Sequence, residues 1–296
     1  MKIAILYGGD SEEREISLVS GKAIYDSLIK RSYDVELIDT KYNFIDKLLK
    51  NKFDIVFIAL HGKDGEDGSI QGLLQSLNIP YTGSGVLSSA ICMNKIISKK
   101  IVNSEGFKTP KTFFSNSIPK ESEFPLIAKP INGGSSIRTI ILRTKNDFEQ
   151  YINKNDISDI MFESFIEGKE ITVGLLELTK PIALTPIEIR PKNEFYDYES
   201  KYVKGMTDYI MPPEIPEDKT KEIKNIAIKL FKLLKCQGFA RADFIYDGED
   251  FYFLEMNTIP GFTPTSDVPI AAEFDGISFD EVVEIILKSA FKSKII

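Results

Sequence analysis

One stretch constrains the fold of this chain more than any other, the run from Phe239 to Ser266. Two apolar, aromatic-rich segments flank residues 247–250, Asp-Gly-Glu-Asp, and this arrangement predicts a β-hairpin. Folding the chain at that turn brings Asp243 roughly opposite Glu255. Glu255 and Asn257 are two residues apart, so both point to the same face of their strand. The pattern therefore predicts three oxygen-bearing side chains on one face of a strand pair.

Those three side chains have two possible uses. Hard divalent cations such as Mg²⁺ bind oxygen ligands, and Mg²⁺ usually combines one or two carboxylates with substrate phosphates. Burying polar groups on an apolar hairpin is unfavourable without a partner. Spacing alone fits a metal site and a solvent-facing surface equally well. The sharp turn at residues 258–261, Thr-Ile-Pro-Gly, favours a site, because a ligand could approach backbone amides there.

Composition excludes several classes of protein. The 296 residues are enough for two or three domains, with 43% hydrophobic and 27% charged residues, as in ordinary globular proteins. The net charge of −7 and the dispersed basic residues argue against nucleic acid or an anionic membrane as a partner. Cys92 and Cys236 form no CxxC pattern and indicate reduced core thiols. Without a signal peptide or an apolar run of ~18 residues, the expected location is cytoplasmic.

The N-terminal region alternates strands and helices. Strands are expected at 2–6, 34–38 and 55–60, and helices at 16–29 and 43–50. This alternation predicts a parallel sheet covered by helices, whose ligands bind at the carboxyl ends of the strands. Gly8-Gly9 and His61-Gly62 lie at such ends. His61 is the only histidine, and the alternatives for it are a structural hydrogen-bonding role, a substrate contact, or general-base work.

A different organisation begins near Thr109-Pro110. Helices are expected at 70–77 and 93–103 before it, and at 146–152, 216–235 and 279–290 after it. Strands are expected at 124–130, 137–142, 160–165, 170–178 and 181–189. The Gly/Ser-rich loop 131–136 could bind an anion or be a plain flexible turn, and it matches neither common nucleotide fingerprint. The tyrosine-dense segment 193–208 has no periodicity, which is typical of a functional loop or a surface excursion.

Several separated motifs occur in one order along the chain. They are residues 7–17 (YGGDSEEREIS), 59–62 with 65–68, 81–85, Lys129-Pro130, 134–136, 195–202, 238–243 and 255–261. Through them the sequence resembles the D-alanine–D-alanine ligases of the ATP-grasp superfamily over essentially its whole length. The resemblance implies an α/β (α+β overall) ATP-grasp fold of three domains. These are an N-terminal α/β domain at 1–93, a central domain with the glycine-rich loop at 94–180, and a C-terminal domain with the metal site at 181–296.

The resemblance also implies a reaction. ATP phosphorylates one D-alanine carboxylate to an acylphosphate, the amine of a second D-alanine attacks it, and phosphate leaves. The dipeptide product serves peptidoglycan synthesis, and the resemblance implies a cytoplasmic homodimer. Such chemistry needs cations around the phosphates, two positioned zwitterions and a stabilised tetrahedral oxyanion.

Site residues follow from the same resemblance. Two Mg²⁺ (or Mn²⁺) ions would be bound by Asp243, Glu255 and Asn257. ATP would be bound by Lys95, Lys129, Ser135, Glu163, Phe165, Ile166, Glu170 and Lys201, with the lysines on phosphates, the two glutamates at the adenine and ribose ends, and Phe165 and Ile166 lining the base pocket. Arg241 and the amide of Gly261 would stabilise the oxyanion.

The two substrates have their own expected contacts. Glu13 would hold the ammonium of the first D-alanine, with His61 nearby, and Ser266 would bind the carboxylate of the second. Ser135 and Tyr202 would connect Glu13 to the loops that cover the phosphates, excluding water from the acylphosphate.

Three departures from the family pattern leave alternatives open. Arg138 replaces the last glycine of Gly-Ser-Ser-x-Gly, which stiffens the loop, restricts its backbone or adds a phosphate contact; Gly133 replaces a glutamate. Asp267 stands where an apolar residue is common, and we expect it to point away from the second substrate. One alternative is a ligase of the same family that uses D-serine or D-lactate as the second substrate; Lys201-Tyr202 argues against D-lactate. The other alternative is a non-catalytic ATP-binding relative.

Overall fold

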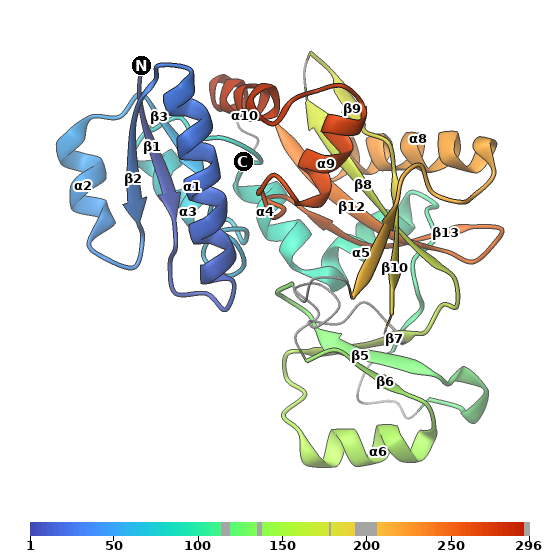
Figure 1. Cartoon of the computed structure of the whole chain (residues 1–296). Coiled ribbons are helices and arrows are strands. Elements are labelled where there is room, and N and C mark those ends of the chain that lie inside the picture. The colour runs from blue at the N-terminus through green and yellow to red at the C-terminus, as the bar shows by residue number, and fades with distance from the viewer. Residues whose placement is uncertain (114–118, 135–137, 178, 193–205, 293–296) are drawn as a thin grey trace.

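The computed structural model describes residues 1–113, 119–134, 138–177, 179–192 and 206–292. Its strands form three sheets. Figure 1 shows the N-terminal sheet at the left, the largest sheet at the upper right and a small sheet with one helix below them. The predicted division into domains at residues 93 and 180 stays a prediction.

The N-terminal sheet is parallel, as predicted. Its strands are β1 (Lys2–Tyr7), β2 (Asp34–Asp39) and β3 (Ile55–Ile58), in the order β2-β1-β3. The helices α1 (Arg14–Lys30) and α2 (Phe44–Asn51) connect them. Because β1 and β3 are buried on both faces, they read as continuous apolar runs. Their carboxyl ends lead into the loops that carry Glu13 and His61.

Three helices follow this sheet, α3 (Ser69–Ser76), α4 (Val86–Met93) and α5 (Lys95–Ser104). The sequence predicted only the first and the last of them. Asn94 ends α4 and caps α5, because its side chain accepts a hydrogen bond from the amide of Ile97. The helix expected from residue 93 therefore begins at Lys95, and this cap fixes where the Lys95 side chain emerges.

The small sheet is antiparallel. It contains β4 (Thr112–Phe113), β5 (Leu126–Pro130), β6 (Ile140–Leu142) and β7 (Ile160–Ser164), in the order β4-β7-β5-β6. A short 3₁₀ helix, η1 (Glu121–Glu123), precedes β5, and α6 (Lys145–Lys154) packs Phe148 against Phe162. The predicted hairpin of residues 124–130 with 137–142 is confirmed by the pairing of β5 with β6.

The largest sheet has the order β11-β10-β8-β12-β13, with β9 paired to β8. Its strands are β8 (Lys169–Glu177), β9 (Pro181–Ala183), β10 (Ile187–Pro191), β11 (Thr207–Ile210), β12 (Phe239–Tyr246) and β13 (Phe251–Asn257). The single strand expected at 181–189 is wrong. Ala183 pairs with Leu175 and Ile187 with Thr172, so the chain carries one extra residue there, and Pro186 lacks an amide hydrogen for the ladder.

Helices α8 (Glu217–Leu233), α9 (Asp267–Phe274) and α10 (Phe279–Lys288) complete the fold, with η2 (Ser289–Phe291) after them. The sequence did not predict α9 or β11. Helix α10 packs against α1, where Ile24 and Val283 belong to one apolar core, and Arg31 and Glu284 form an ion pair of 2.7 Å beside it. The N-terminal sheet is thereby joined to the largest sheet through its C-terminal helices.

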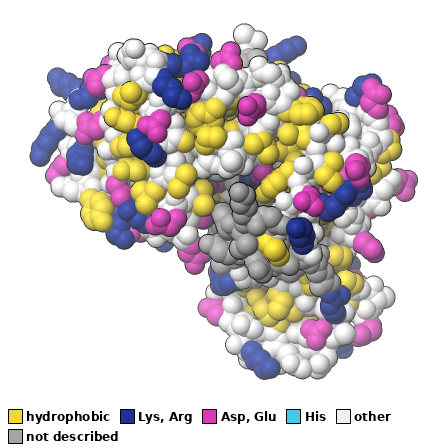
Figure 2. Space-filling model, viewed as in Figure 1, with side chains coloured by type: hydrophobic (Ala, Val, Ile, Leu, Met, Phe, Trp, Pro, Cys, Tyr) yellow, Lys and Arg dark blue, Asp and Glu magenta, His cyan; other side chains and the backbone are white. Residues whose placement is uncertain are grey.

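The surface carries charges of both signs. Basic and acidic side chains are interspersed over the face shown in Figure 2. Within the described part of the chain, no helix has the length and apolar character needed to cross a membrane.

Candidate active site

The hairpin of β12 and β13 places four polar side chains together. Asp243 pairs with Glu255 across the strands, and Arg241 pairs with Asn257. The predicted position of Asp243 opposite Glu255 is confirmed. Since side chains two residues apart share a face, all four project from one face of the hairpin.

Each of the three candidate metal ligands has a donor within the protein. Asp243 accepts hydrogen bonds from Thr172 Oγ1 (2.6 Å to Oδ1) and from Arg241, whose Nε lies 2.9 Å from Oδ1 and whose Nη2 lies 2.7 Å from Oδ2. Glu255 Oε2 lies 2.9 Å from Nζ of Lys95, and Asn257 Oδ1 accepts from the amide of Ile259 at 3.1 Å. Burial disfavours the charged guanidinium, but the surrounding carboxylates raise the pKa of Arg241 well above its usual value.

The donor set suits a metal that arrives with a phosphate ligand. Among the residues that the structure describes, no group of three or more His, Cys, Asp or Glu side chains could hold a metal ion. Two carboxylates and one amide oxygen are too few for a protein-only cage. They match the usual Mg²⁺ arrangement, in which substrate phosphates and water complete the coordination.

A second charged cluster lies between α5 and the small sheet. Glu163 on β7 forms ion pairs with both Lys99 and Lys129, and only 1% of the Glu163 side chain is exposed. Burial alone would raise the pKa of Glu163, but the two ammonium groups lower it. Burial lowers the pKa of Lys99 to about 7, whereas the neighbouring carboxylates raise that of Lys129. Two cations therefore share one buried carboxylate.

Sequence reasoning missed Lys99. A signal for it was present, because Lys99 lies four residues after Lys95 on α5 and so faces the same side of the helix. The side chain of Lys99 is only 2% exposed, which is rare for a lysine without a specific partner.

One cavity lies between the small sheet and the largest sheet and joins both clusters. It brings together every described candidate for ATP binding. Its lining includes Lys95, Lys129, Glu163, Phe165, Ile166, Glu170, Arg241, Asp243 and Glu255. Ser135 and Lys201 lie outside the described residues.

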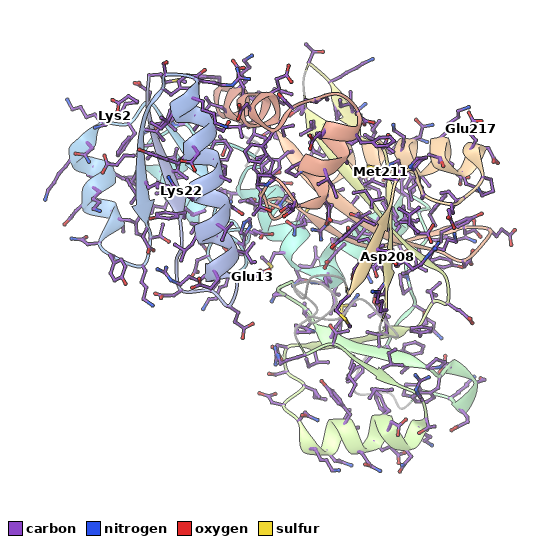
Figure 3. The ribbon with its side chains drawn as sticks, viewed as in Figure 1. Lys2, Glu13, Lys22, Asp208, Met211 and Glu217 are labelled. Carbon is purple, nitrogen blue, oxygen red and sulfur yellow. The ribbon has the colours of Figure 1, made fainter. Side chains whose placement is uncertain are left out.

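An adjoining cavity of about 330 Å³ contains the described candidates for substrate binding. Glu13, His61, Gly261 and Ser266 line it, as do Arg241 and Glu255. Figure 3 places Glu13 at the end of α1 that faces the other two sheets. The volume of this cavity is near the lower end of the range for small-molecule sites, roughly 300–1,000 Å³. Tyr202 lies outside the described residues.

His61 is held by the protein at both ring nitrogens. Nε2 lies 3.0 Å from Ser20 Oγ, and Nδ1 lies 2.9 Å from the carbonyl of Ile259. The carbonyl of Ile259 can only accept, so Nδ1 donates to it, and Nε2 of the neutral ring then accepts from the Ser20 hydroxyl, whose oxygen also accepts from the amide of Phe262. These contacts favour a structural role over general-base work, and they tie the N-terminal sheet to the turn that follows β13. A contact of His61 with substrate stays a prediction.

The loop that carries Glu13 is fixed by a charged pair. Arg14 forms a bidentate pair with Asp39, with Nη2 2.6 Å from Oδ2, and also donates to the carbonyl of Gly9. The Arg14 guanidinium lowers the pKa of Asp39 to about 2. Gly62 leaves room for the Glu13 carboxylate, since a Cβ at Gly62 would lie 2.8 Å from Glu13 Oε2. Glu13 is therefore positioned from two sides.

Glu66 is a further carboxyl group in this cavity, beside Glu13, Glu255 and Asp267, and sequence reasoning did not single it out. It is 8% exposed, and its Oε1 accepts from the amide of Gly62 at 3.0 Å. Burial raises the pKa of Glu66. Its place in the Gly-Glu-Asp-Gly motif was the available signal.

The expectation that Asp267 points away is wrong. Asp267 lines the substrate cavity beside Ser266, and its Oδ2 lies 3.4 Å from Nη1 of Arg241. The buried positive charge of Arg241 attracts the carboxylate that sequence reasoning turned outward. Arg138 has a φ of +58°, the left-handed region that glycine favours, and it pairs with Asp159. A phosphate contact by Arg138 stays a prediction.

Comparison with known proteins places these residues in a family. The family models for the D-ala D-ala ligase N-terminus and C-terminus match residues 2–47, 40–84 and 95–288. A D-alanine–D-alanine ligase of Desulforamulus reducens is 43% identical, with 99% of each chain covered.

Two solved structures have the same fold. The ATP complex of the D-alanine–D-alanine ligase from Bacillus anthracis has a TM-score of 0.82 at 32% identity, covering 98% of this chain and 97% of that one. The VanG D-Ala:D-Ser ligase from Enterococcus faecalis has a TM-score of 0.83 at 29% identity, covering 98% and 99%. The ATP-grasp architecture predicted from the motifs is thereby confirmed, and the chain belongs to the D-alanine–D-alanine ligase family.

Proposed function

We propose that this chain, an ATP-dependent D-alanine–D-alanine ligase by its family, carries out ligation where its two cavities meet. The observation that carries the proposal is that Arg241 and Glu255 line both the cavity of the ATP candidates and that of the substrate candidates. A phosphoryl group passing from ATP to a D-alanine carboxylate has to cross such a junction. The product would be the D-alanyl-D-alanine used in peptidoglycan synthesis.

Asp243, Glu255 and Asn257 would hold Mg²⁺, or Mn²⁺, together with the phosphates of ATP. When bound, the metal ions would neutralise negative charge that develops during phosphoryl transfer. Lys95 and Lys129 would bind phosphates, and Glu163, Phe165, Ile166 and Glu170 the nucleoside. Ser135 and Lys201 complete the ATP set by resemblance alone.

Each D-alanine carries an ammonium and a carboxylate, so the site needs groups that bind a positive charge and groups that bind a negative charge. Glu13 would hold the ammonium of the first D-alanine, as its carboxylate is fixed by the neighbouring loop. Ser266 would bind the carboxylate of the second; its Oγ accepts from the amide of Thr263 at 3.0 Å, which orients it. The guanidinium of Arg241 and the amide of Gly261 would stabilise the oxyanion formed by attack of the second amine.

Water must be kept from the acylphosphate. A link from Glu13 through Ser135 to Tyr202 would make closure depend on an occupied first site. We also propose a cytoplasmic homodimer, which rests on the family resemblance and on ATP as the substrate.

The test is phosphate release from ATP and Mg²⁺ with D-alanine, compared with D-serine, D-lactate and L-alanine as the second substrate. Release with D-alanine alone, together with formation of the dipeptide, is the expected result. Greater release with D-serine would support the alternative specificity, for which the VanG ligase gives a structural precedent. Measurable ATP binding without release in any mixture would indicate a non-catalytic relative.

A further inference from the structure

Lys95 connects three parts of the candidate ATP site. Its ammonium lies 2.9 Å from Glu255 Oε2 on β13 and donates to the carbonyl of Gly133 at 2.5 Å. Gly133 belongs to the loop between β5 and β6, and Lys95 itself is the first residue of α5. The side chain of Lys95 is 9% exposed. One positive charge thus joins a helix, the loop and a candidate metal ligand.

The same ammonium occupies an oxygen that a metal ion would need. Asp243 and Glu255 lie opposite each other on adjacent strands, where like charges repel. Arg241 neutralises Asp243, and Lys95 neutralises Glu255. A divalent cation and the Lys95 ammonium therefore compete for the Glu255 carboxylate.

We propose that Lys95 is an internal counter-ion that keeps free divalent metal from Glu255 and leaves this carboxylate when nucleotide phosphates bind. The proposal rests on the metal-binding role of Glu255 proposed above. It follows that metal binds tightly only together with nucleotide, because the phosphates offer Lys95 a new partner.

The geometry points to Lys95 and not Arg241 as the cation that leaves. Arg241 grips Asp243 through a bidentate contact, and Asp243 is also bonded to Thr172. A planar guanidinium fork loses more on leaving such a partner than an ammonium on a flexible stem. The Glu255 side chain is 22% exposed and that of Asp243 is 8% exposed, so Glu255 is the easier carboxylate for solvent and ions to reach.

The experiment measures Mn²⁺ binding to the full chain without nucleotide, by loss of the electron paramagnetic resonance signal of free Mn²⁺. The variants are Lys95→Met, which removes the ammonium, and Lys95→Arg, which keeps a positive charge. The matched control is Lys129→Met, because Lys129 lines the same cavity but pairs with Glu163. It removes the same charge and leaves the Lys95 ammonium on Glu255, although Lys129 also attracts Glu255 without a direct ion pair.

Lys95→Met is expected to bind Mn²⁺ at least about tenfold more tightly than the wild-type protein, which corresponds to about 1.4 kcal/mol. Lys129→Met is expected to gain less than about threefold, and Lys95→Arg to stay near wild type. Adding Glu255→Gln to Lys95→Met is expected to abolish the gain. Equal Mn²⁺ affinity of Lys95→Met and wild type would overturn the proposal, as would an equal gain in both lysine-to-methionine variants.

A nucleotide arm separates the two proposals. Wild-type protein with a non-hydrolysable ATP analogue is expected to bind Mn²⁺ more tightly than the same concentration of the analogue without protein, which is the control for metal held by the analogue in solution. If it does and Lys95→Met shows no gain without nucleotide, the counter-ion role is wrong and the metal site stands. If wild type binds no Mn²⁺ even with the analogue, the metal site fails and the counter-ion role with it. Lys95→Gln repeats the measurement if thermal unfolding shows that Lys95→Met is not folded.

Discussion

Two ion clusters line the cavity between the small and the largest sheets, and they differ in burial and in charge balance. The Glu163 cluster, Lys99, Lys129 and Glu163, sets two ammonium groups around one carboxylate that is 1% exposed. In the Glu255 cluster, Lys95 and Glu255, one ammonium meets one carboxylate that is 22% exposed. Both clusters use a lysine from the same face of α5, four residues apart.

The difference in burial indicates that lysine–glutamate ion pairs have two different roles in this cavity. A buried pair resists separation, because breaking it leaves a charge in a low-dielectric interior. A more exposed pair exchanges partners readily, because water and ions stabilise the separated charges. We therefore infer that the Glu163 cluster holds the fold of the cavity together, and that the Glu255 cluster is the one that changes partners during the reaction.

The largest expected effect comes from breaking the Glu163 cluster. Glu163→Gln is expected to lower the free energy of unfolding by about 3–5 kcal/mol, because it removes the buried carboxylate that pairs with both Lys99 and Lys129. Urea-induced unfolding measures this change. Glu170→Gln, in the same cavity, is the matched control and is expected to cost far less. A loss below about 1 kcal/mol in Glu163→Gln would mean that its cluster is not structural.

The Glu255 cluster should show the opposite pattern. Glu255→Gln is expected to lower kcat by about a hundredfold or more, about 2.7 kcal/mol in activation free energy, because a metal-binding carboxylate is lost. Its free energy of unfolding is expected to change by less than about 1 kcal/mol, as for other partly exposed ion pairs. Steady-state phosphate release and urea unfolding of the same preparation test both halves. Equal stability losses in Glu255→Gln and Glu163→Gln would remove the distinction between the clusters.

The charge excess of the Glu163 cluster predicts a pH dependence of stability. Burial lowers the pKa of Lys99 from 10.5 in the unfolded chain to about 7 in the folded protein. Between these values the unfolded state binds more protons, so the free energy of unfolding rises with pH from about 7 to about 10.5. Below about pH 7 the full cost of a buried ammonium is present.

Lys99→Met is expected to remove this part of the pH dependence. The measurement is the slope of unfolding free energy against pH, taken for wild type and variant over that range. Lys100→Met, from the exposed side of the same helix, is the control and is expected to keep the wild-type slope. A wild-type slope in Lys99→Met would mean that Lys99 is not the titrating group.

Sequence reasoning was most accurate where local periodicity sets the geometry. The hairpin register that pairs Asp243 with Glu255 follows from the two-residue repeat of strands and from a turn at residues 247–250. The parallel N-terminal sheet follows in the same way from alternating apolar runs. In the hairpin the paired residues lie close together in the sequence, and in the N-terminal sheet the pattern of each strand is local although the paired strands are far apart.

It failed where tertiary contacts decide. Helix α4 is short and was missed because Ser88 and Ser89 are buried in it, which blurs the apolar pattern. Lys99 looks like a surface lysine until β7 brings Glu163 to it across 64 residues. Asp267 was predicted to point away from the cavity because repulsion by the second substrate was considered and attraction by Arg241 was not. Ser135, Lys201 and Tyr202 lie outside the described residues, so their roles stay predictions.

The smallest expected effect comes from Asp267, which lines the substrate cavity together with Glu255. Asp267→Leu is expected to lower the KM for the second D-alanine by about threefold, about 0.6 kcal/mol, because it removes a negative charge beside Ser266, which we propose to bind a carboxylate. The value of kcat is expected to change by less than about twofold, since Asp243 holds Arg241 through closer contacts than the 3.4 Å contact with Asp267.

The split between KM and kcat decides what Asp267 does. Asp267→Asn keeps the shape and removes the charge, so it is expected to match Asp267→Leu if repulsion of the substrate is the effect. A fall in kcat of tenfold or more in both variants would show instead that Arg241 needs two carboxylates to be held. In that case Arg241 and its carboxylates would have a structural role like that of the Glu163 cluster, and Lys95 and Glu255 would remain the exchangeable pair.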